Sequence, residues 1–270
     1  MITFPNAKIN LGLNITERRP DGYHNIETVF YPIPIHDALE IVESDNISLT
    51  ISGLKIDGNT EQNLIMKAYR LLASSFELPK VEINLLKKIP FGAGLGGGSA
   101  DAAFTIKMLN EKFKLNLTEE TQKTFAAKLG ADCAFFIANR PSYATGIGDK
   151  LKDINISLSN YYIYLIKPDV HISTSEAYSS VVPHKSNVSL YDRILKTPIT
   201  NWKNVIFNDF EESVFTKHRE IKEVKELLYK QGALYASMSG SGSSVFGIFD
   251  TRPQPLSIPK NWFSFIGVFD

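Results

Sequence analysis

The sequence predicts an α+β protein in which strands and helices do not alternate as a regular βαβ repeat. The first 50 residues contain runs in which apolar and polar residues alternate, as in half-buried strands. The middle of the chain changes to apolar residues at helical spacing, and the second half combines strand-like runs with pairs of helices. This irregular mixture favours α+β layering.

The composition is that of an ordinary globular protein. The chain has 270 residues, of which 43% are apolar and 21% charged, so it can form one large domain or two of ordinary size. Lys plus Arg equals Asp plus Glu at 29 each. A neutral balance argues against nucleic acid or a membrane surface as partner, although a local basic pocket stays open.

Cysteine usage and the N-terminal residues favour a soluble cytoplasmic protein. Cys133 is the single cysteine, so no disulfide can form within the chain, as a reducing compartment permits. The segment MITFPNAKIN has no apolar signal region, and no run approaches 18 consecutive apolar residues. No Cys/His spacing indicates a structural zinc site. We expect a monomer or a weak homodimer.

In the first half, period-two patterns predict strands, which we expect over 7–15, 38–44, 47–52 and 80–86. The Pro-Asp-Gly of residues 18–24 predicts a turn. Apolar residues at helical spacing predict a helix over 63–76, with Asn63 as its N-cap.

Three more helices are expected before the middle of the chain. One begins near Ser99 and runs to residue 113, a second runs from Thr118 to Gly130, and a short third covers 131–138. The following segment PSYATGIGDKL is rich in turn residues. We therefore expect a boundary there, between domains at 1–152 and 153–270.

The second half begins with a strand over 161–168. Helices are expected over 174–181, 203–216 and 218–231. In the last of these, the predicted buried stripe consists of Ile221, Val224, Leu227 and Leu228. Residues 235–249 predict strand, tight loop and strand, and 262–269 predict a final strand.

The segment PFGAGLGGGSADAA has five glycines between Gly92 and Gly98, and three known phosphate-binding patterns compete for it. The Walker loop fails because Gly98 stands where its lysine is required. The protein-kinase loop fails because Ser99 stands at its valine position and no His-Arg-Asp follows. The dinucleotide fingerprint matches only formally, at Gly92, Gly94 and Gly97, without a βαβ start or a well-placed acid.

Physical chemistry still favours an anion at this loop. Backbone N–H groups without side chains lead into a helix N-terminus near Ser99, where unpaired donors and the helix dipole converge. Polyphosphate is the anion that we expect to bind there. The alternative is that the glycine loop is only a linker or a tight turn. The second cluster, SMSGSGSS at 237–244, can be a hairpin turn or a second close approach to phosphate.

Two charged residues are candidates for chemistry. Lys8 and Asn10 share one face of the strand over 7–15, although a lone strand lysine is more often a solvated edge residue. Asp132 stands where a helix begins, a position at which a carboxylate is most often an N-cap. Beside a lysine, it would stay ionised and could accept a hydroxyl proton.

Four segments, in order along the chain, carry a resemblance to a known family. They are AKINLGLNITERRPDGYHNIETVF at 7–30, PFGAGLGGGSADAA at 90–103, GADCAFF at 130–136 and SMSGSGSSVFGIF at 237–249. The glycine segment resembles the second motif of the galactokinase, homoserine, mevalonate and phosphomevalonate (GHMP) kinase superfamily. The whole set resembles its 4-diphosphocytidyl-2-C-methyl-D-erythritol kinase family, because the other members do not share the DGYH segment.

The resemblance implies a two-domain GHMP-kinase fold with the active site in the inter-domain cleft. It also implies transfer of the ATP γ-phosphate to the 2-hydroxyl of 4-diphosphocytidyl-2-C-methyl-D-erythritol (CDP-methylerythritol), in non-mevalonate isoprenoid synthesis. Lys8 and Asp132 match the catalytic pair: Asp132 would accept or orient the hydroxyl proton, and Lys8 would lower the pKa of that hydroxyl. Mg²⁺ is expected with ATP.

The resemblance further assigns two sets of ligand-binding residues. Those assigned to ATP are Asn63, Lys87, Pro90, Gly92, Gly94, Leu95, Gly96, Gly97, Gly98, Ser99 and Ala100. Those assigned to the substrate are Asn10, Tyr23, His24, Phe30, Thr174, Tyr178, Gly240 and Ser241. A flat cytosine ring with a polar edge suits aromatic side chains and one histidine. Tyr23 and His24 can instead be surface residues, and Phe30 and Tyr178 core aromatics.

Some positions depart from the family pattern. Ala100 replaces a serine that many members carry, and Ser173 and Ser175 stand where some relatives have proline, which weakens the alignment of Thr174 and Tyr178. No acidic residue is identified as a Mg²⁺ ligand. Two other functions compete: a mevalonate-type or homoserine kinase, against which the DGYH segment argues, and a nucleotide sensor without catalysis, against which Lys8 and Asp132 argue.

Overall fold

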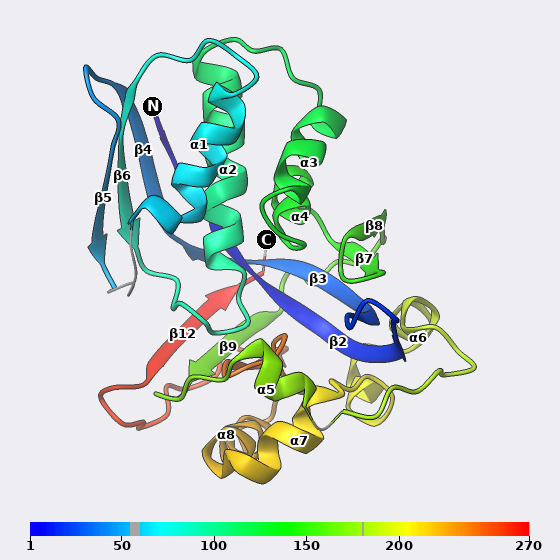
Figure 1. Ribbon diagram of the computed structural model, residues 1–270. Helices are drawn as coiled ribbons and strands as arrows, with labels where there is room; N and C mark the ends of the chain where they lie inside the picture. Colours follow the sequence, from blue (N-terminus) through cyan, green and yellow to red (C-terminus); the bar gives the residue numbers. More distant parts are fainter. Residues whose placement is uncertain (55–59, 180, 270) are drawn as a thin grey trace. The chain divides into compact units, whose positions relative to one another are not determined.

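The computed structural model describes residues 1–54, 60–179 and 181–269 (Figure 1). These residues form two compact units whose segments are interleaved along the chain. The first unit comprises Met1–Ala7, Ile35–Phe91 and Gly96–Arg140, and the second comprises Lys8–Pro34, Gly92–Leu95 and the chain from Pro141 onward. The expected division at residue 152 is linear and stays a prediction.

The first unit is built on a four-stranded sheet in the order β1-β4-β6-β5. Its strands are β1 (Ile2–Thr3), β4 (Ala38–Glu43), β5 (Ser48–Gly53) and β6 (Val81–Lys87). β5 pairs with β6 in parallel and the other pairs are antiparallel. Its helices are η1 (Thr60–Gln62), α1 (Leu64–Ala73), α2 (Gly97–Lys112), α3 (Glu119–Ala127) and α4 (Cys133–Ala138). α1 and α2 lie side by side (Figure 1).

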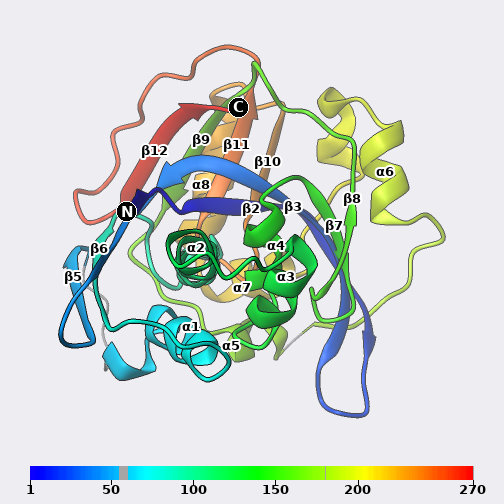
Figure 2. The same cartoon turned by 90° about the horizontal axis from the view of Figure 1, so that it is seen from above.

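The second unit holds most of one sheet and all of another. The first of these sheets has the order β2-β3-β7-β8 and the other β10-β11-β9-β12. The strands are β2 (Asn6–Arg18), β3 (His24–His36), β7 (Ser142–Thr145), β8 (Lys150–Asp153), β9 (Tyr162–Lys167), β10 (Tyr235–Met238), β11 (Val245–Phe249) and β12 (Phe263–Val268). Figure 2 shows β12, β9, β11 and β10 side by side.

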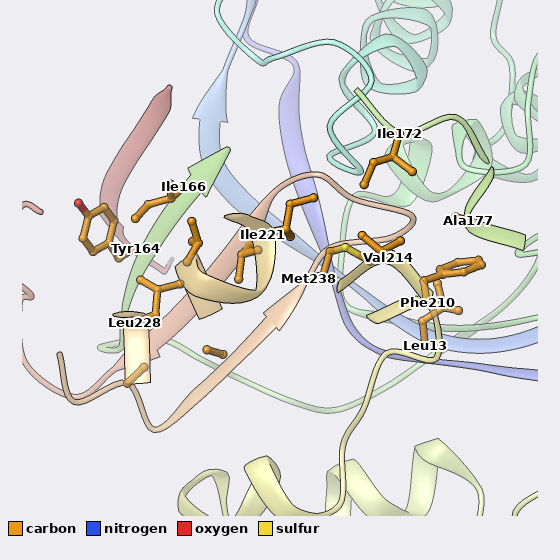
Figure 3. Close-up of a cluster of buried hydrophobic side chains, with 14 of the residues drawn as sticks. Leu13, Tyr164, Ile166, Ile172, Ala177, Phe210, Val214, Ile221, Leu228 and Met238 are labelled. Atoms are coloured by element: carbon orange, nitrogen blue, oxygen red, sulfur yellow. The ribbon is translucent and has the colours of Figure 1, made fainter. Parts of the chain in front are cut away.

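The helices of the second unit are α5 (Thr174–Tyr178), α6 (Leu190–Lys196), η2 (Ile199–Asn204), α7 (Phe210–Lys217) and α8 (Arg219–Lys230). η2 contacts β10, and α7 packs on α8. α8 packs against β9, β10 and β11. Its buried residues Ile221, Val224 and Leu228 join a core that includes Tyr164 and Met238 (Figure 3). This burial of apolar surface stabilises the second unit.

The predicted α+β class and most predicted elements are confirmed. The strands expected over 7–15, 38–44, 47–52, 80–86, 161–168 and 262–269 are present, as is the hairpin of β10 and β11. Thr118 caps α3, since its side chain accepts a hydrogen bond from the Thr121 N–H. Within the described residues, no helix is long and apolar enough to cross a membrane.

Several expectations were wrong. Residues 141–151, expected as turns, contain β7 and the start of β8, and both β3 and α6 were not predicted. The helix expected over 174–181 ends at Tyr178, and residue 180 lies outside the described chain. Leu227 is 37% exposed. It lies six residues after Ile221, which at about 100° per residue turns it away from the buried stripe.

The helix expected over 203–216 is interrupted between Asn204 and Phe210. Leu13 forms an isolated bridge with Asn208, and the Asp209 carboxylate accepts a 2.7 Å hydrogen bond from the Ile15 N–H. These contacts with β2 compete with helical hydrogen bonding. Tertiary structure therefore overrides the local helical pattern here.

Candidate active site

Lys8 and Asn10 lie on one face of β2, as the alternation predicts, and both are buried. Lys8 is 3% exposed, which excludes the solvated edge alternative. Its Nζ donates hydrogen bonds to Asn10 Oδ1 at 2.6 Å and to the Gly94 carbonyl at 3.2 Å, and lies 5.0 Å from the centre of the Phe30 ring. Asn10 Nδ2 in turn donates to Thr28 Oγ1 at 2.9 Å. The ammonium is thus held in one orientation by oxygen acceptors.

The first glycine cluster (Gly92–Gly98) and the second (237–244) meet in the second unit, through residues Gly92–Leu95 of the first. Gly94 and Ser239, which are in contact there, are 145 residues apart in the sequence. Ser239 Oγ donates a 2.8 Å hydrogen bond to the Gly94 carbonyl, and the Ser244 N–H donates to the Ala93 carbonyl at 3.3 Å. At Gly240, which has φ +56°, an added Cβ would lie 3.3 Å from Asn10 Oδ1. The structure therefore brings Lys8, Asn10, Gly94 and Gly240 together.

The second cluster is held by two buried residues that the sequence reasoning missed. Asn208 Nδ2 donates to the carbonyls of Met238 and Gly240, both at 2.8 Å. Glu211 Oε1 accepts hydrogen bonds from the Met238 N–H at 2.8 Å and from Ser237 Oγ at 3.2 Å. Both residues lie in the segment misread as one helix, so no periodicity could reveal their role.

The glycine segment continues in the first unit as the beginning of α2. The helix starts at Gly97, two residues before the expected start, after Gly96 in the left-handed region at φ +70°. Gly97 packs closely, since an added Cβ would lie 2.8 Å from Ile89 Cγ2. The first N–H groups of a helix have no acceptor within it, so those of Gly97, Gly98 and Ser99 are available to an anion.

The space around Gly98 shows whether a phosphate could approach this helix start. An added Cβ there would meet no atom closer than Leu64 Cδ1 at 3.9 Å, and the residue has no positive φ. Neither packing nor backbone conformation therefore requires glycine, although glycine in a helix costs about 1 kcal/mol relative to alanine. The open space at Gly98 fits a ligand that approaches the backbone, and the residues present are compatible with a bound phosphate.

A buried ion cluster lies at the base of this helix start. Lys87 Nζ contacts Asp37 Oδ2, and Asp101 Oδ2 at 2.8 Å, and all three residues are buried. Asp37 Oδ1 also accepts hydrogen bonds from the N–H groups of Lys88 and Ile89. Burial raises the pKa of Asp101 to about 7, because Lys87 offsets only part of the desolvation, and Asp101 Oδ1 has no hydrogen-bond partner. The cluster links β6, the start of β4 and α2.

The ATP-binding roles of Asn63 and Lys87 stay predictions. Asn63 is the N-cap of α1, as predicted, because its Oδ1 accepts a 2.9 Å hydrogen bond from the Ile65 N–H. The Lys87 ammonium forms ion pairs with two carboxylates, those of Asp37 and Asp101. Any contact of Lys87 with the adenine would therefore be made by its backbone. Pro90, Leu95 and Ala100 are buried.

Asp132 stands directly before α4 in the first unit. It occupies the N-cap position of α4, as the alternative expected, but it has helical backbone angles and its side chain makes no capping hydrogen bond. The neighbouring thiol of Cys133 is buried, which raises its pKa to about 11. A protonated, buried thiol is inert as a nucleophile, so Asp132 is the stronger candidate for chemistry in this segment.

Aromatic side chains gather around His24 in the second unit. The His24 and Tyr178 rings stack with centroids 4.7 Å apart, and Tyr178 meets Phe210 edge to face at 4.8 Å. Burial, followed by the charge of Arg18, lowers the pKa of His24, so its imidazole stays neutral at pH 7 with one donor and one acceptor. Tyr23 is 62% exposed.

The other proposed substrate residues come from separate segments of the chain. Phe30 is 2% exposed and its ring faces the Lys8 ammonium, which favours the alternative that it is a core aromatic. Thr174 is the first residue of α5, which Ser173 caps by accepting a hydrogen bond from the Glu176 N–H. Ser241 is half-buried beside Gly240. Their contacts with a substrate stay predictions.

Among the described residues, no group of three or more His, Cys, Asp or Glu side chains could hold a metal ion. Mg²⁺ commonly keeps several waters and binds through substrate phosphates, so a protein cage is not required for it.

Comparisons with known proteins agree with the motifs. Residues 63–140 match the family described as GHMP kinases N terminal domain, and residues 194–264 match GHMP kinases C terminal. The 4-diphosphocytidyl-2-C-methyl-D-erythritol kinase of Bacteroides fragilis is 58% identical over 94% of both chains. That of Cytophaga hutchinsonii is 52% identical, also over 94% of both chains.

Solved structures extend the similarity to the fold. A crystal structure of 4-(cytidine 5'-diphospho)-2C-methyl-D-erythritol kinase superposes with a TM-score of 0.80 at 31% identity, covering 92% of this chain and 90% of that one. The homoserine kinase of Cytophaga hutchinsonii has a TM-score of 0.66 at 16% identity, covering 98% and 94%. The second similarity concerns the fold alone.

Proposed function

Because the chain belongs to the 4-diphosphocytidyl-2-C-methyl-D-erythritol kinase family of the GHMP kinases, we propose that it phosphorylates that substrate with ATP. The γ-phosphate of ATP is transferred to the 2-hydroxyl of CDP-methylerythritol, and ADP leaves. This is a step of non-mevalonate isoprenoid synthesis. Phosphoryl transfer depends chiefly on positioning and on charge stabilisation.

The observation that carries the proposal is the unexplained glycine at the start of α2. Gly98 has open space where its side chain would be, beside helix N–H groups that have no acceptor within the helix. Bound ATP supplies the phosphoryl group and the negative charge that this helix start attracts. The role of the protein there is to hold phosphate oxygens with backbone N–H groups.

Lys8 supplies a fixed positive charge. Its Nζ is buried and held by Asn10 Oδ1 and the Gly94 carbonyl, so little reorganisation is needed when a hydroxyl begins to lose its proton. We assign it the role of lowering the pKa of the substrate hydroxyl. Asn10 lies beside the Lys8 ammonium, and Gly240 lies beside Asn10 Oδ1. Both residues are therefore proposed to line the site of the substrate next to Lys8.

We assign to Asp132 the role of accepting or orienting the proton of the substrate hydroxyl. Asp132 stands directly before α4, where the GADCAFF segment matches the catalytic acid of the family. A carboxylate that accepts or orients the hydroxyl proton completes the pair with Lys8. The two residues belong to different units, and the pairing is proposed from the family motifs.

The stacked rings of His24 and Tyr178 are proposed to bind the cytosine. Their centroids are 4.7 Å apart, which leaves no room for a third ring between them. The cytosine is therefore expected on an outer face of the stack, with the neutral His24 imidazole able to donate or accept at the polar edge. Thr174, Ser241 and Tyr23 complete the proposed substrate set.

Mg²⁺ is proposed to enter with ATP on its phosphate oxygens, where it neutralises charge. The domains are proposed as an N-terminal ATP-binding domain at 1–152 and a C-terminal domain at 153–270. The family matches at 63–140 and 194–264 support one domain on each side of that boundary.

The test is phosphorylation by the purified protein with ATP, Mg²⁺ and a panel of CDP-methylerythritol, mevalonate and homoserine. We expect ADP formation and a phosphorylated product with the cytidine substrate alone. Turnover of mevalonate or homoserine instead would favour the other kinases of the superfamily. ATP binding without transfer to any alcohol would favour a nucleotide sensor and contradict the proposal.

A further inference from the structure

His171 lies against the backbone of the first glycine cluster. A Cβ added to Gly92 would be 2.9 Å from His171 Nδ1 and 3.0 Å from its Cε1, so the imidazole occupies the space beside that α-carbon. Gly92 also has φ +61°, which by itself favours glycine. Two independent constraints therefore keep residue 92 free of a side chain, and one of them is the position of His171.

The segment that carries His171 is fixed on both sides. Ser243 Oγ donates a 2.6 Å hydrogen bond to the Val170 carbonyl, and Lys167 Nζ donates to the same carbonyl at 3.3 Å. Ile172 is buried in the core of the second unit, close to Gly242. The imidazole itself is exposed, so this is not a core histidine that fills space. A fixed backbone with an exposed polar ring is the arrangement expected of a ligand-binding residue.

Three segments of the second unit converge at this point, and only residues Gly92–Leu95 of the first glycine cluster take part. The Ala93 and Gly94 carbonyls accept hydrogen bonds from Ser244 and Ser239, and the Val170 carbonyl accepts one from Ser243. The first glycine cluster, the segment at 168–172 and the second glycine cluster are thereby joined. Lys8 lies at the Gly94 end of this group and His171 at the Gly92 end.

We propose that His171 is a further ligand-binding residue, whose imidazole donates a hydrogen bond to a phosphate group held at the first glycine cluster. This rests on the proposed function, because both ATP and CDP-methylerythritol carry phosphates. Imidazole N–H groups suit phosphate oxygens, and a charged acceptor makes such a bond stronger than a neutral one.

The experiment compares His171→Ala and His171→Gln with the wild type. Dissociation constants for ATP and for CDP-methylerythritol are measured separately by equilibrium dialysis, without turnover, followed by KM and kcat. We expect His171→Ala to weaken binding of one of these ligands roughly tenfold, and His171→Gln, which keeps an N–H donor, to restore most of it. The weakened ligand identifies whose phosphate His171 contacts.

His36→Ala provides the matched control, since His36 is an exposed histidine at the end of β3 in the first unit. It should leave both dissociation constants unchanged. If His171→Ala binds both ligands within twofold of the wild type, or loses only kcat, the proposed role of His171 is wrong. A wild type that binds both ligands but transfers no phosphate would contradict the proposed function instead.

Discussion

A Cβ at Gly94 would lie 1.9 Å from the carbonyl oxygen of Ser239, so the two glycine clusters touch through their backbones. Gly94 also has φ +74° and its carbonyl accepts hydrogen bonds from both Lys8 and Ser239. The Gly94 backbone thus links a proposed catalytic residue to the second cluster. No residue other than glycine fits at position 94. At Gly98, by contrast, an added Cβ would meet no atom closer than 3.9 Å.

Gly94→Ala and Gly98→Ala should separate packing from ligand binding. Gly94→Ala should destabilise the protein by at least about 2 kcal/mol, because the methyl group meets backbone and φ is positive. Gly98→Ala should leave stability unchanged or raise it by up to about 1 kcal/mol, yet lower kcat/KM for ATP roughly 100-fold. Urea unfolding and steady-state kinetics measure both. A fully active Gly98→Ala would remove the phosphate role of the α2 start.

Replacing Asp132 should abolish chemistry and spare ATP binding. Asp132→Asn keeps the shape of the side chain but loses its basicity, so kcat should fall by about 10²- to 10⁴-fold. The dissociation constant for ATP, measured by equilibrium dialysis, should stay within about twofold. Asp45→Asn, at an exposed position of the first unit, is the control. An unchanged kcat would exclude Asp132 from the mechanism.

Lys87→Met should destabilise the protein strongly. The substitution leaves Asp37 and Asp101 buried without their cation, which typically costs about 3–5 kcal/mol. Lys123→Met is the control, because Lys123 pairs with Glu119 and Glu120 on the surface and should change stability by less than about 1 kcal/mol. Equal losses in urea unfolding would contradict the buried cluster.

Asp101 should make stability depend on pH. Its pKa is about 7 in the folded protein and the usual 3.8 when unfolded, so between these values the folded state holds a proton that the unfolded state has lost. The free energy of unfolding should therefore fall as pH rises from about 4 to about 7, by at most about 1.4 kcal/mol per pH unit from this group. Asp101→Asn cannot titrate, so the same measurement should show a weaker decline. An identical slope in the variant would assign the effect to other groups.

Tyr178→Ala should affect the cytidine substrate selectively. Stacking of a base on an aromatic ring is worth about 1–3 kcal/mol, so KM for CDP-methylerythritol should rise about tenfold or more while KM for ATP stays unchanged. Tyr191→Ala removes an aromatic ring that packs on Tyr143 and serves as control. A parallel rise in both KM values would point to a general structural role for Tyr178.

The local features of this protein follow from short-range sequence patterns. Alternation at 7–15 predicted β2 and placed Lys8 and Asn10 on one face, and Asn63 and Thr118 predicted two helix starts. Helix caps and strand alternation depend on residues a few positions apart, which a single sequence displays directly. The glycine cluster likewise predicted a helix start, with an error of two residues in its position, and its phosphate-binding role stays a prediction.

Other features depend on distant parts of the chain, so only the tertiary structure decided them. The break in the helix expected over 203–216 arises because Asn208 and Asp209 bind segments of β2 and the second glycine cluster. The burial of Lys8, the contact between Gly94 and Ser239, the cluster around Lys87 and the position of His171 against Gly92 all join residues that the sequence separates widely. Packing, burial and charge pairing are properties of the folded chain, and neither periodicity nor composition encodes which distant residues satisfy them.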